Sequence, residues 1–263
     1  MGKHLMEYKI ISGRTVEIRR SWLSVRQPGE SRKGRAARVA GRSSERKIKA
    51  NEQSSVRELA RVINSTFEPG DAQIILKYDD QHLPGSYADA EADLKRFLSK
   101  VRYELRKAGA EPLVAVWVTA NWSPKREAPA RYHHHAVVKS ETVALIRRLW
   151  TAGSFSEQDL DERGDHSALA EYMVANVNRI GAGKAKWHAT RTVSRPIYTE
   201  PEPVSSVEGI QPERDSVIQE HQTATDEDGR VTSSYIRCTL KERPRVRGGK
   251  IVLPDKRRRK REE

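Results

Sequence analysis

The chain has 263 residues, of which 36% are hydrophobic and 32% charged, and its formal charge is +13. No apolar run approaches 18 residues, the N-terminal MGKHLMEYKI lacks the apolar core of a secretory signal, and Cys238 is the single cysteine. We therefore expect no transmembrane helix, no signal peptide and no internal disulfide. We expect a cytoplasmic protein without a membrane partner, whose basic charge suits a polyanion, most often nucleic acid.

The N-terminal 50 residues combine a predicted hairpin with a basic arm. Residues 8–24 alternate in polarity around Gly13, which predicts two antiparallel strands. Residues 26–50 hold nine basic and two acidic residues with Gly, Ser and Pro and no apolar period. We interpret this arm as a mobile segment that contacts phosphates, with simple solvation as the alternative.

The next segment predicts a helix, a strand and a second, longer helix. Ser55 and Glu58 form a capping box before VRELARVINSTF, and residues 72–78 form a short apolar strand. Ser86 and Asp89 form another capping box. The apolar residues that follow it have the helical period, namely Leu94, Phe97, Leu98, Val101 and Leu105. Gly109 is expected to stop that helix.

Two β-rich runs and two helices complete the predicted folded region. Residues 112–122 and 131–139 are expected to form strands joined by a hairpin-length loop. Ser140 is expected to cap a helix that ends before Gly153, and a last helix is expected over residues 166–180. This order predicts an α+β fold in which helices pack against an antiparallel sheet.

The C-terminal third is expected to lack a core. Residues 200–230 hold nine acids, two arginines and three prolines, which predicts a disordered acidic linker. Residues 241–263 hold eleven basic and four acidic residues and resemble the first basic arm in charge. We therefore divide the chain into residues 1–50, a folded domain of residues 51–199, and a largely disordered segment of residues 200–263.

Three consecutive histidines lie in the predicted strand 131–139. Because strand side chains alternate between faces, His133 and His135 share one face and His134 points to the other. Two imidazoles on one face of a rigid strand form a candidate pair of ligands for a divalent metal. Val137 lies on the face of the pair, which would place a metal near the rim of the sheet. The alternative is a polar stretch of an edge strand.

Tyr172 is the candidate nucleophile on the last predicted helix. Leu169, Met173, Val177 and Ile180 form the apolar stripe of that helix. Tyr172 lies about 100° from Met173, which leaves its hydroxyl outside the core. Such a tyrosine is either an ordinary boundary residue or a nucleophile, with Arg179 near enough on the helix to meet a phosphate.

Together these segments resemble the HUH endonucleases. RYHHHAVV (131–138) is similar to their histidine–hydrophobic–histidine signature, with His134 in the hydrophobic slot, and AEYMVAN (170–176) resembles their catalytic-tyrosine helix. AQIILKYDDQHLP (72–84) is similar to their first motif strand. The flanking stretches 51–71 and 183–196 resemble one subgroup, the single-tyrosine replication-associated proteins of bacterial phages, plasmids and integrative elements.

Two positions depart from the subgroup pattern. Ala120 stands where the subgroup usually has an acidic residue before the histidines, and Ala175 stands where it usually has a lysine after the tyrosine. The third metal ligand therefore stays open, and its candidates are Asp79, Asp80, Glu127, His82 and Asn121. The role of the lysine is open to Lys184, Lys186 or Arg179.

The resemblance implies a DNA nicking and joining enzyme. His133 and His135 would hold Mg²⁺ or Mn²⁺, and Tyr172 would attack single-stranded DNA at a replication origin to leave a 5′-phosphotyrosyl enzyme and a 3′-hydroxyl that primes the host replication machinery. The implied DNA contacts are Arg131, Arg179, Lys184, Lys186 and Arg191. The alternatives are a transposase or relaxase of the same superfamily, or a DNA-binding protein that has lost catalysis.

Overall fold

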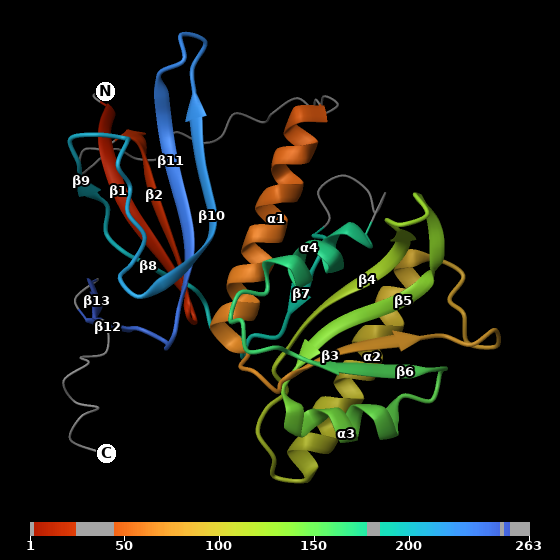
Figure 1. The fold of residues 1–263 in the computed structure, drawn as a ribbon. Coiled ribbons are helices and arrows are strands. Elements are labelled where there is room, and N and C mark those ends of the chain that lie inside the picture. Colours follow the sequence, from red (N-terminus) through yellow and green to blue (C-terminus); the bar gives the residue numbers. More distant parts are fainter. Residues whose placement is uncertain (1–2, 25–44, 178–184, 248–249, 253–263) are drawn as a thin grey trace, which may run out of the picture. The chain divides into compact units, whose positions relative to one another are not determined.

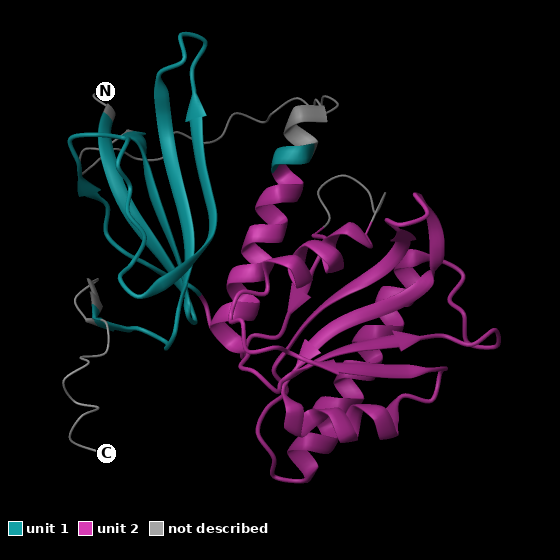
Figure 2. Ribbon diagram, in the orientation of Figure 1, with its two compact units in different colours: residues 1–50, 196–263 teal, residues 51–195 magenta. Residues whose placement is uncertain are grey.

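The structure is a computed structural model that describes residues 3–24, 45–177, 185–247 and 250–252. The chain divides into two compact units (Figure 2). Unit 2 consists of residues 51–195, and unit 1 consists of residues 1–50 together with residues 196–263. No helix within the described ranges is long and apolar enough to cross a bilayer.

Unit 2 is built on a five-stranded antiparallel sheet (Figure 1). Its strands are β3 (Ala72–Lys77), β4 (Ala115–Ser123), β5 (Ala128–Val138), β6 (Phe155–Asp159) and β7 (His188–Ala189). Their order across the sheet is β6-β3-β5-β4-β7, and every neighbouring pair is antiparallel. The predicted α+β class with an antiparallel sheet is therefore confirmed.

Four described helices cover both faces of this sheet. They are α1 (Glu45–Thr66), α2 (Tyr87–Lys107), α3 (Ser140–Leu149) and α4 (Ser167–Ala175). Leu94 and Leu98 of α2 and Ile146 of α3 pack against one face, and Ile63 of α1 and Met173 of α4 pack against the other. Helices on both faces explain why β5 ends in a run of buried residues instead of alternating between buried and exposed ones.

Of the two predicted capping boxes, the structure confirms the one at Ser86 and contradicts the one at Ser55. Ser86 is the N-cap of α2, and its side chain accepts a hydrogen bond from the backbone N–H of Asp89, as predicted. The expected cap at Ser55 is wrong, because α1 already begins at Glu45. Residues 45–54 contain no glycine or proline, so nothing in them stops a helix from extending toward the N-terminus. At the other end of α2, Gly109 has φ +65° and ends the helix as expected.

The start of α3 is also different from the prediction. Lys139 is its N-cap residue and Ser140 is the first helical residue. The capping acceptor comes from elsewhere in the chain, since Asp71 accepts the backbone N–H of Ser140 at 3.1 Å and the ammonium of Lys139 at 2.9 Å. A carboxylate at a helix N-terminus stabilises the exposed N–H groups and the helix dipole.

Unit 1 joins the two ends of the chain in a second antiparallel sheet. Its order is β10-β11-β2-β1-β8, and β9 also pairs with β1. The strands are β1 (Lys3–Ser12), β2 (Thr15–Ser24), β8 (Ile197–Tyr198), β9 (Glu202–Pro203), β10 (Ser216–Thr225) and β11 (Val231–Leu240). The hairpin predicted around Gly13 is confirmed as β1 and β2.

The predicted acidic linker is therefore largely wrong. β10 lies within it and pairs with β11 along its length, and β11 pairs in turn with β2. Most side chains of β10 stay exposed, because backbone hydrogen bonds hold the strand to the sheet, and its one acid, the half-buried Glu220, forms an ion pair with Arg237 of β11 at 3.2 Å. Val16, Ile18, Ile236 and Cys238 belong to the small core of this unit.

Most of the predicted basic segments lie outside the described residues, namely residues 25–44, 248–249 and 253–263. Within the C-terminal basic segment, β12 (Arg245–Arg247) and β13 (Lys250–Val252) form a short hairpin.

Candidate catalytic site on strand β5 and helix α4

The three histidines lie on β5, the central strand of the unit 2 sheet. β5 has β3 on one side and β4 on the other, and His134 is paired with Leu76 and Thr119 in these neighbours. The alternative of an edge strand is therefore excluded. Along the strands, the pair lies near one end of the sheet, because β3 ends at Lys77, which is paired with His133. The strand order could not be derived from local sequence, since it depends on which distant segments pair.

His134 is a satisfied core residue on one face. It has no exposed surface, its Nε2 lies 2.8 Å from the hydroxyl of Tyr78, and its Nδ1 lies 3.2 Å from the hydroxyl of Thr119. Trp150 packs on the same side, with its ring centroid 6.3 Å from that of His134. Burial is the main cause that lowers the pKa of His134 to about 3, with smaller contributions from the neighbouring His133 and His135. The ring is therefore neutral at physiological pH.

His133 and His135 share the opposite face and point at one another. Their Nε2 atoms are 3.1 Å apart and their rings are nearly perpendicular. The Nδ1 of His133 lies 2.8 Å from the backbone oxygen of Arg131. Because a carbonyl oxygen only accepts, this Nδ1 carries the hydrogen, and the Nε2 of His133 presents its lone pair toward the Nε2 of His135. The predicted face assignment is confirmed.

The electrostatics keep both rings of this pair neutral. Burial lowers the pKa of His133 and lowers the pKa of His135 to about 3. The Nδ1 of His135 is buried without a hydrogen-bond partner among the described residues. Neutral imidazole is the form that binds metal. Two nitrogens bound to one metal ion at about 2.0–2.1 Å are separated by about 3 Å, which matches the observed distance between the Nε2 atoms.

Tyr172 packs against one member of this pair, His135. Its ring centroid is 5.1 Å from that of His135, with the rings nearly perpendicular, and 47% of the residue is exposed. Its hydroxyl has no hydrogen-bond partner among the described residues. The prediction that Tyr172 is a boundary residue with a free hydroxyl is confirmed, and its place beside the histidine pair is new information from the structure.

Packing and backbone hydrogen bonds position the helix that carries Tyr172. Met173 and Val174 are buried against Val118 and Val137 of the sheet. At the end of α4, the backbone oxygen of Asn176 accepts the N–H groups of Asn121 and Trp122, at 3.0 and 3.1 Å. The β4–β5 register shifts at this point, which frees both groups from the sheet ladder.

Ala120 stands where the family that this chain resembles usually has an acidic residue, and it lies next to the pair of His133 and His135. Ala120 is opposite His133 in the β4–β5 ladder, so its Cβ shares the face of His133 at a typical separation of about 4.5–5.5 Å. An acid at this position would reach the histidines, whereas alanine supplies no ligand. Among the described residues, no group of three His, Cys, Asp or Glu side chains forms a metal site. The two histidines therefore fit a metal only as a pair.

The candidate third ligands have other contacts or lie elsewhere. Asp79 accepts hydrogen bonds from the backbone of Gln81 and His82, lies 2.7 Å from the ring of His82, and has its pKa lowered chiefly by that ring. Asp80 forms an ion pair with Arg131 at 2.6 Å. Glu127 has φ 49° in the turn between β4 and β5. No described contact brings any of these carboxylates to the histidine pair.

Lys77 is the residue that sequence analysis missed. It lies opposite His133 in the β3–β5 ladder, which places it on the face of the histidine pair, and its charge contributes to the lowered pKa of His133 and His135. Its side chain is exposed and forms no ion pair with another described residue. The alternation of side chains along residues 72–78 shows which of them share a face with Lys77. Only the register with β5 shows that this is the face of His133 and His135.

The end of β3 is held in place by a close backbone approach. The backbone N–H of Lys77 donates to Ser154, and the indole of Trp150 donates to the oxygen of Lys77. Gly153 lies so near that a Cβ there would meet this oxygen at 2.3 Å. Only glycine permits this approach, so Gly153 supports the strand that carries Lys77.

The predicted DNA contacts do not form one cluster. Arg131 is exposed on β5, two residues before His133, where it also donates to the backbone oxygen of Tyr78. Lys186 forms an ion pair with Glu52 at 2.6 Å, and Arg191 lines a separate cavity described below. Arg179 and Lys184 lie outside the described residues.

Comparison with known proteins gives no further assignment. No protein-family model, no curated protein and no solved structure matches this chain. The function must therefore be argued from the geometry of the site itself.

Proposed function

We propose that this protein nicks and rejoins single-stranded DNA through a 5′-phosphotyrosyl intermediate, as an initiator of rolling-circle replication of the HUH endonuclease type. One observation carries the proposal. The exposed Tyr172 packs its ring against His135, whose Nε2 points at the Nε2 of His133. A free phenol beside a pair of neutral imidazoles is an arrangement suited to attack on a phosphate held at that pair.

The proposed reaction is a transesterification. The hydroxyl oxygen of Tyr172 attacks the phosphorus, a new bond between this oxygen and phosphorus forms, and the bond between phosphorus and the 3′-oxygen breaks. The phenolic proton is lost and the leaving 3′-oxygen gains a proton, so that no oxidant or external energy source is needed. Attack by the 3′-hydroxyl on the phosphotyrosine reverses the step and rejoins the strand.

The side chains of this chain have distinct roles in the proposal. A divalent cation held by the Nε2 atoms of His133 and His135 would supply Lewis-acid polarisation of a phosphate oxygen. We favour Mn²⁺ over Mg²⁺, because Mg²⁺ prefers oxygen ligands. Lys77, on the same face, would neutralise charge on the phosphate, a role that Ala175 leaves open. Arg131, exposed on β5 two residues before His133, would contact the DNA backbone.

A second candidate function is DNA binding without catalysis. It is favoured by Ala120, which leaves the histidine pair without a nearby acidic ligand. In that case the fold and the basic residues would serve DNA recognition alone.

The deciding experiment is a covalent trapping assay. The full chain is incubated with labelled single-stranded DNA tiled across the replicon that encodes it, with Mn²⁺, Mg²⁺ or EDTA. We expect a protein–DNA band that survives a denaturing gel, requires the metal and is lost in Tyr172→Phe. Removal of one hydroxyl at an exposed position should change the free energy of unfolding by less than about 0.5 kcal/mol.

Tyr132→Phe is the matched control. Tyr132 precedes the histidines but packs with the opposite core, so its removal should leave the adduct intact. If wild-type protein forms no adduct with any tested metal but binds the same DNA, the second candidate replaces the first. If the adduct persists in Tyr172→Phe, the assignment of the nucleophile is wrong.

A further inference from the structure

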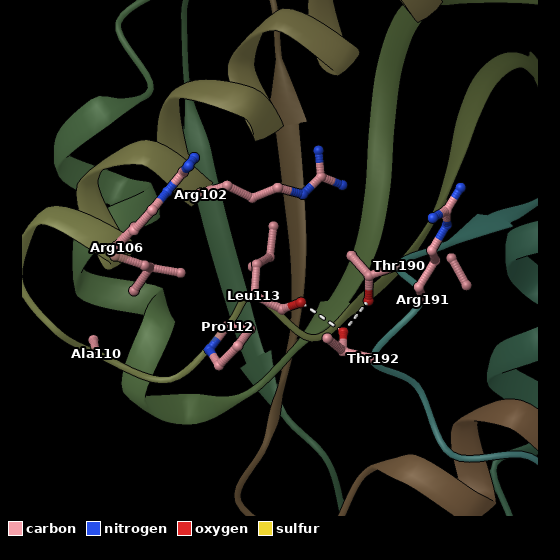
Figure 3. A pocket seen from close by; sticks show the side chains of 10 residues that line it. Arg102, Arg106, Ala110, Pro112, Leu113, Thr190, Arg191 and Thr192 are labelled. Carbon is pink, nitrogen blue, oxygen red and sulfur yellow. Dashed lines mark hydrogen bonds between the residues drawn. The ribbon is translucent and has the colours of Figure 1, made fainter.

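A separate cavity of ≈ 600 Å³ opens in unit 2 between the end of α2 and the segment after β7. Figure 3 shows it from close by, with Arg102 and Arg106 on the helix, Pro112 and Leu113 between, and Thr190 to Thr192 on the opposite side. Its size is within the range of cavities that hold small organic ligands, about 300–1,000 Å³.

The cavity combines cationic walls with an apolar floor. Arg102, Arg106 and Arg191 all line it, are exposed, and form no side-chain hydrogen bond or ion pair with another described residue. None of its lining residues is acidic. Three unpaired guanidinium groups around one hollow favour a phosphate, which guanidinium binds with paired hydrogen bonds.

The two threonines keep the cavity open in a fixed shape. The hydroxyl of Thr192 donates to the backbone oxygen of Leu113 at 2.7 Å and lies 2.7 Å from the hydroxyl of Thr190. The hydroxyl of Thr190 also accepts the N–H of Ala115 at 3.1 Å. These bonds fasten the segment that carries Arg191 to the start of β4, which fixes Arg191 on the side of the apolar floor away from α2 (Figure 3).

The position of the cavity separates it from the histidine pair. It adjoins the beginning of β4, whereas Ala120, opposite His133, lies five residues further along the strand. At about 3.3 Å per residue, the two places are roughly 17 Å apart along β4. A ligand of the cavity is therefore distinct from a phosphate at Tyr172.

We propose that this cavity binds one nucleotide of single-stranded DNA, with its phosphate on Arg102, Arg106 and Arg191 and its base against Pro112 and Leu113. The apolar floor distinguishes the cavity from a merely basic surface, since a base has an apolar face to bury and bulk phosphate does not. The inference goes beyond the proposed nicking reaction, because binding here is measurable in a protein that does not nick.

Binding of fluorescent oligothymidine to the full chain, in EDTA and over a series of salt concentrations, tests the inference. Arg102→Gln, Arg106→Gln and Arg191→Gln should each weaken binding about tenfold. Each should also lower the slope of log affinity against log salt by about 0.7, because one phosphate contact is lost. Arg148→Gln is the matched control, since Arg148 is exposed on α3, has no described ion pair and lies outside the cavity.

The outcomes are decisive in both directions. Losses in the three cavity variants that clearly exceed the loss in Arg148→Gln support the inference, and equal losses overturn it. Tight binding of thymidine 5′-monophosphate that Arg102→Gln abolishes would reassign the cavity to a free nucleotide and also overturn it. Because EDTA prevents nicking, a failure of the trapping assay leaves this binding test unaffected. Conversely, the cavity variants can bind DNA as well as the control does while the wild-type protein still forms the adduct, which would overturn only the inference about the cavity.

Discussion

Strand β5 presents histidines to both faces of the unit 2 sheet, and the two faces give them different surroundings. On one face, His134 has a hydroxyl at each ring nitrogen and a tryptophan beside it. On the other face, His133 and His135 point their Nε2 atoms at one another, and the Nδ1 of His135 has no described partner. All three rings are neutral, since burial lowers each pKa.

The contrast separates a structural histidine from two candidate ligands. A buried polar group that is fully hydrogen-bonded supports its core and has no capacity for further bonds. A converging pair with a free lone pair retains that capacity. The same residue type, one position apart, therefore has opposite expected sensitivities: stability at His134, and activity at His133 and His135.

The largest effect is expected on the ligand face. His133→Ala or His135→Ala should lower adduct formation by more than about 100-fold, because changes to residues that merely support a metal ligand already cost about 10–100-fold. Rates of adduct formation in Mn²⁺ provide the measurement. His134→Leu is the comparison, and it should keep most of the activity. Equal losses in all three variants would break the distinction between the faces.

The second effect is on stability and concerns the opposite face. His134→Leu should lower the free energy of unfolding by about 1–3 kcal/mol, because it leaves the buried hydroxyls of Tyr78 and Thr119 without this partner. Urea denaturation measures the change. Adding Tyr78→Phe to His134→Leu should recover part of the loss, and a second, additive loss would show that the hydrogen bond is not the cause.

The third effect is a dependence of stability on pH. The pKa of His134 is about 3 in the folded chain against about 6.5 in an unfolded chain, so below pH 6.5 the unfolded state binds the extra proton. Stability is thus fully present above pH 6.5 and falls with acidification, by at most about 1.4 kcal/mol per pH unit for this histidine.

Unfolding in urea and EDTA between pH 7.5 and pH 5, chosen to bracket the reference value of about 6.5, checks this slope. The same series in His134→Leu should show a shallower dependence, with a residual slope from His135, whose pKa is also about 3. An identical slope in both proteins would mean that His134 is already exposed to protonation.

The smallest effect is expected from Lys77, the positively charged side chain on the face of His133 and His135. Lys77→Met should slow adduct formation about fivefold while leaving the unfolding free energy nearly unchanged, because the side chain is exposed and unpaired among the described residues. Lys77→Arg should restore part of the rate. Lys95→Met is the matched control, because Lys95 is exposed on α2, and it should leave the rate unchanged.

Much of unit 2 follows from local sequence. The alternation of strand side chains assigns His133 and His135 to one face, the helical period leaves Tyr172 off the core, and the Ser86 capping box starts α2. These features depend on residues two to four positions apart, so the sequence contains them directly. The hairpin around Gly13 belongs to the same class.

Pairing between distant segments was decided only in the tertiary structure. The central place of β5, the meeting of Tyr172 with His135, and the register that brings Lys77 and Ala120 to the histidine face all depend on which strands lie side by side. The same holds for β10, which lies in a segment that looks like a linker by composition. It is ordered because it pairs with β11, which in turn pairs with β2 of the N-terminal hairpin. The arginine cavity joins α2 to residues some 85 positions later, at Thr190 and Arg191. Composition and periodicity describe a segment and its neighbours in the chain, whereas hydrogen bonds between strands and packing between helices select partners across the whole chain.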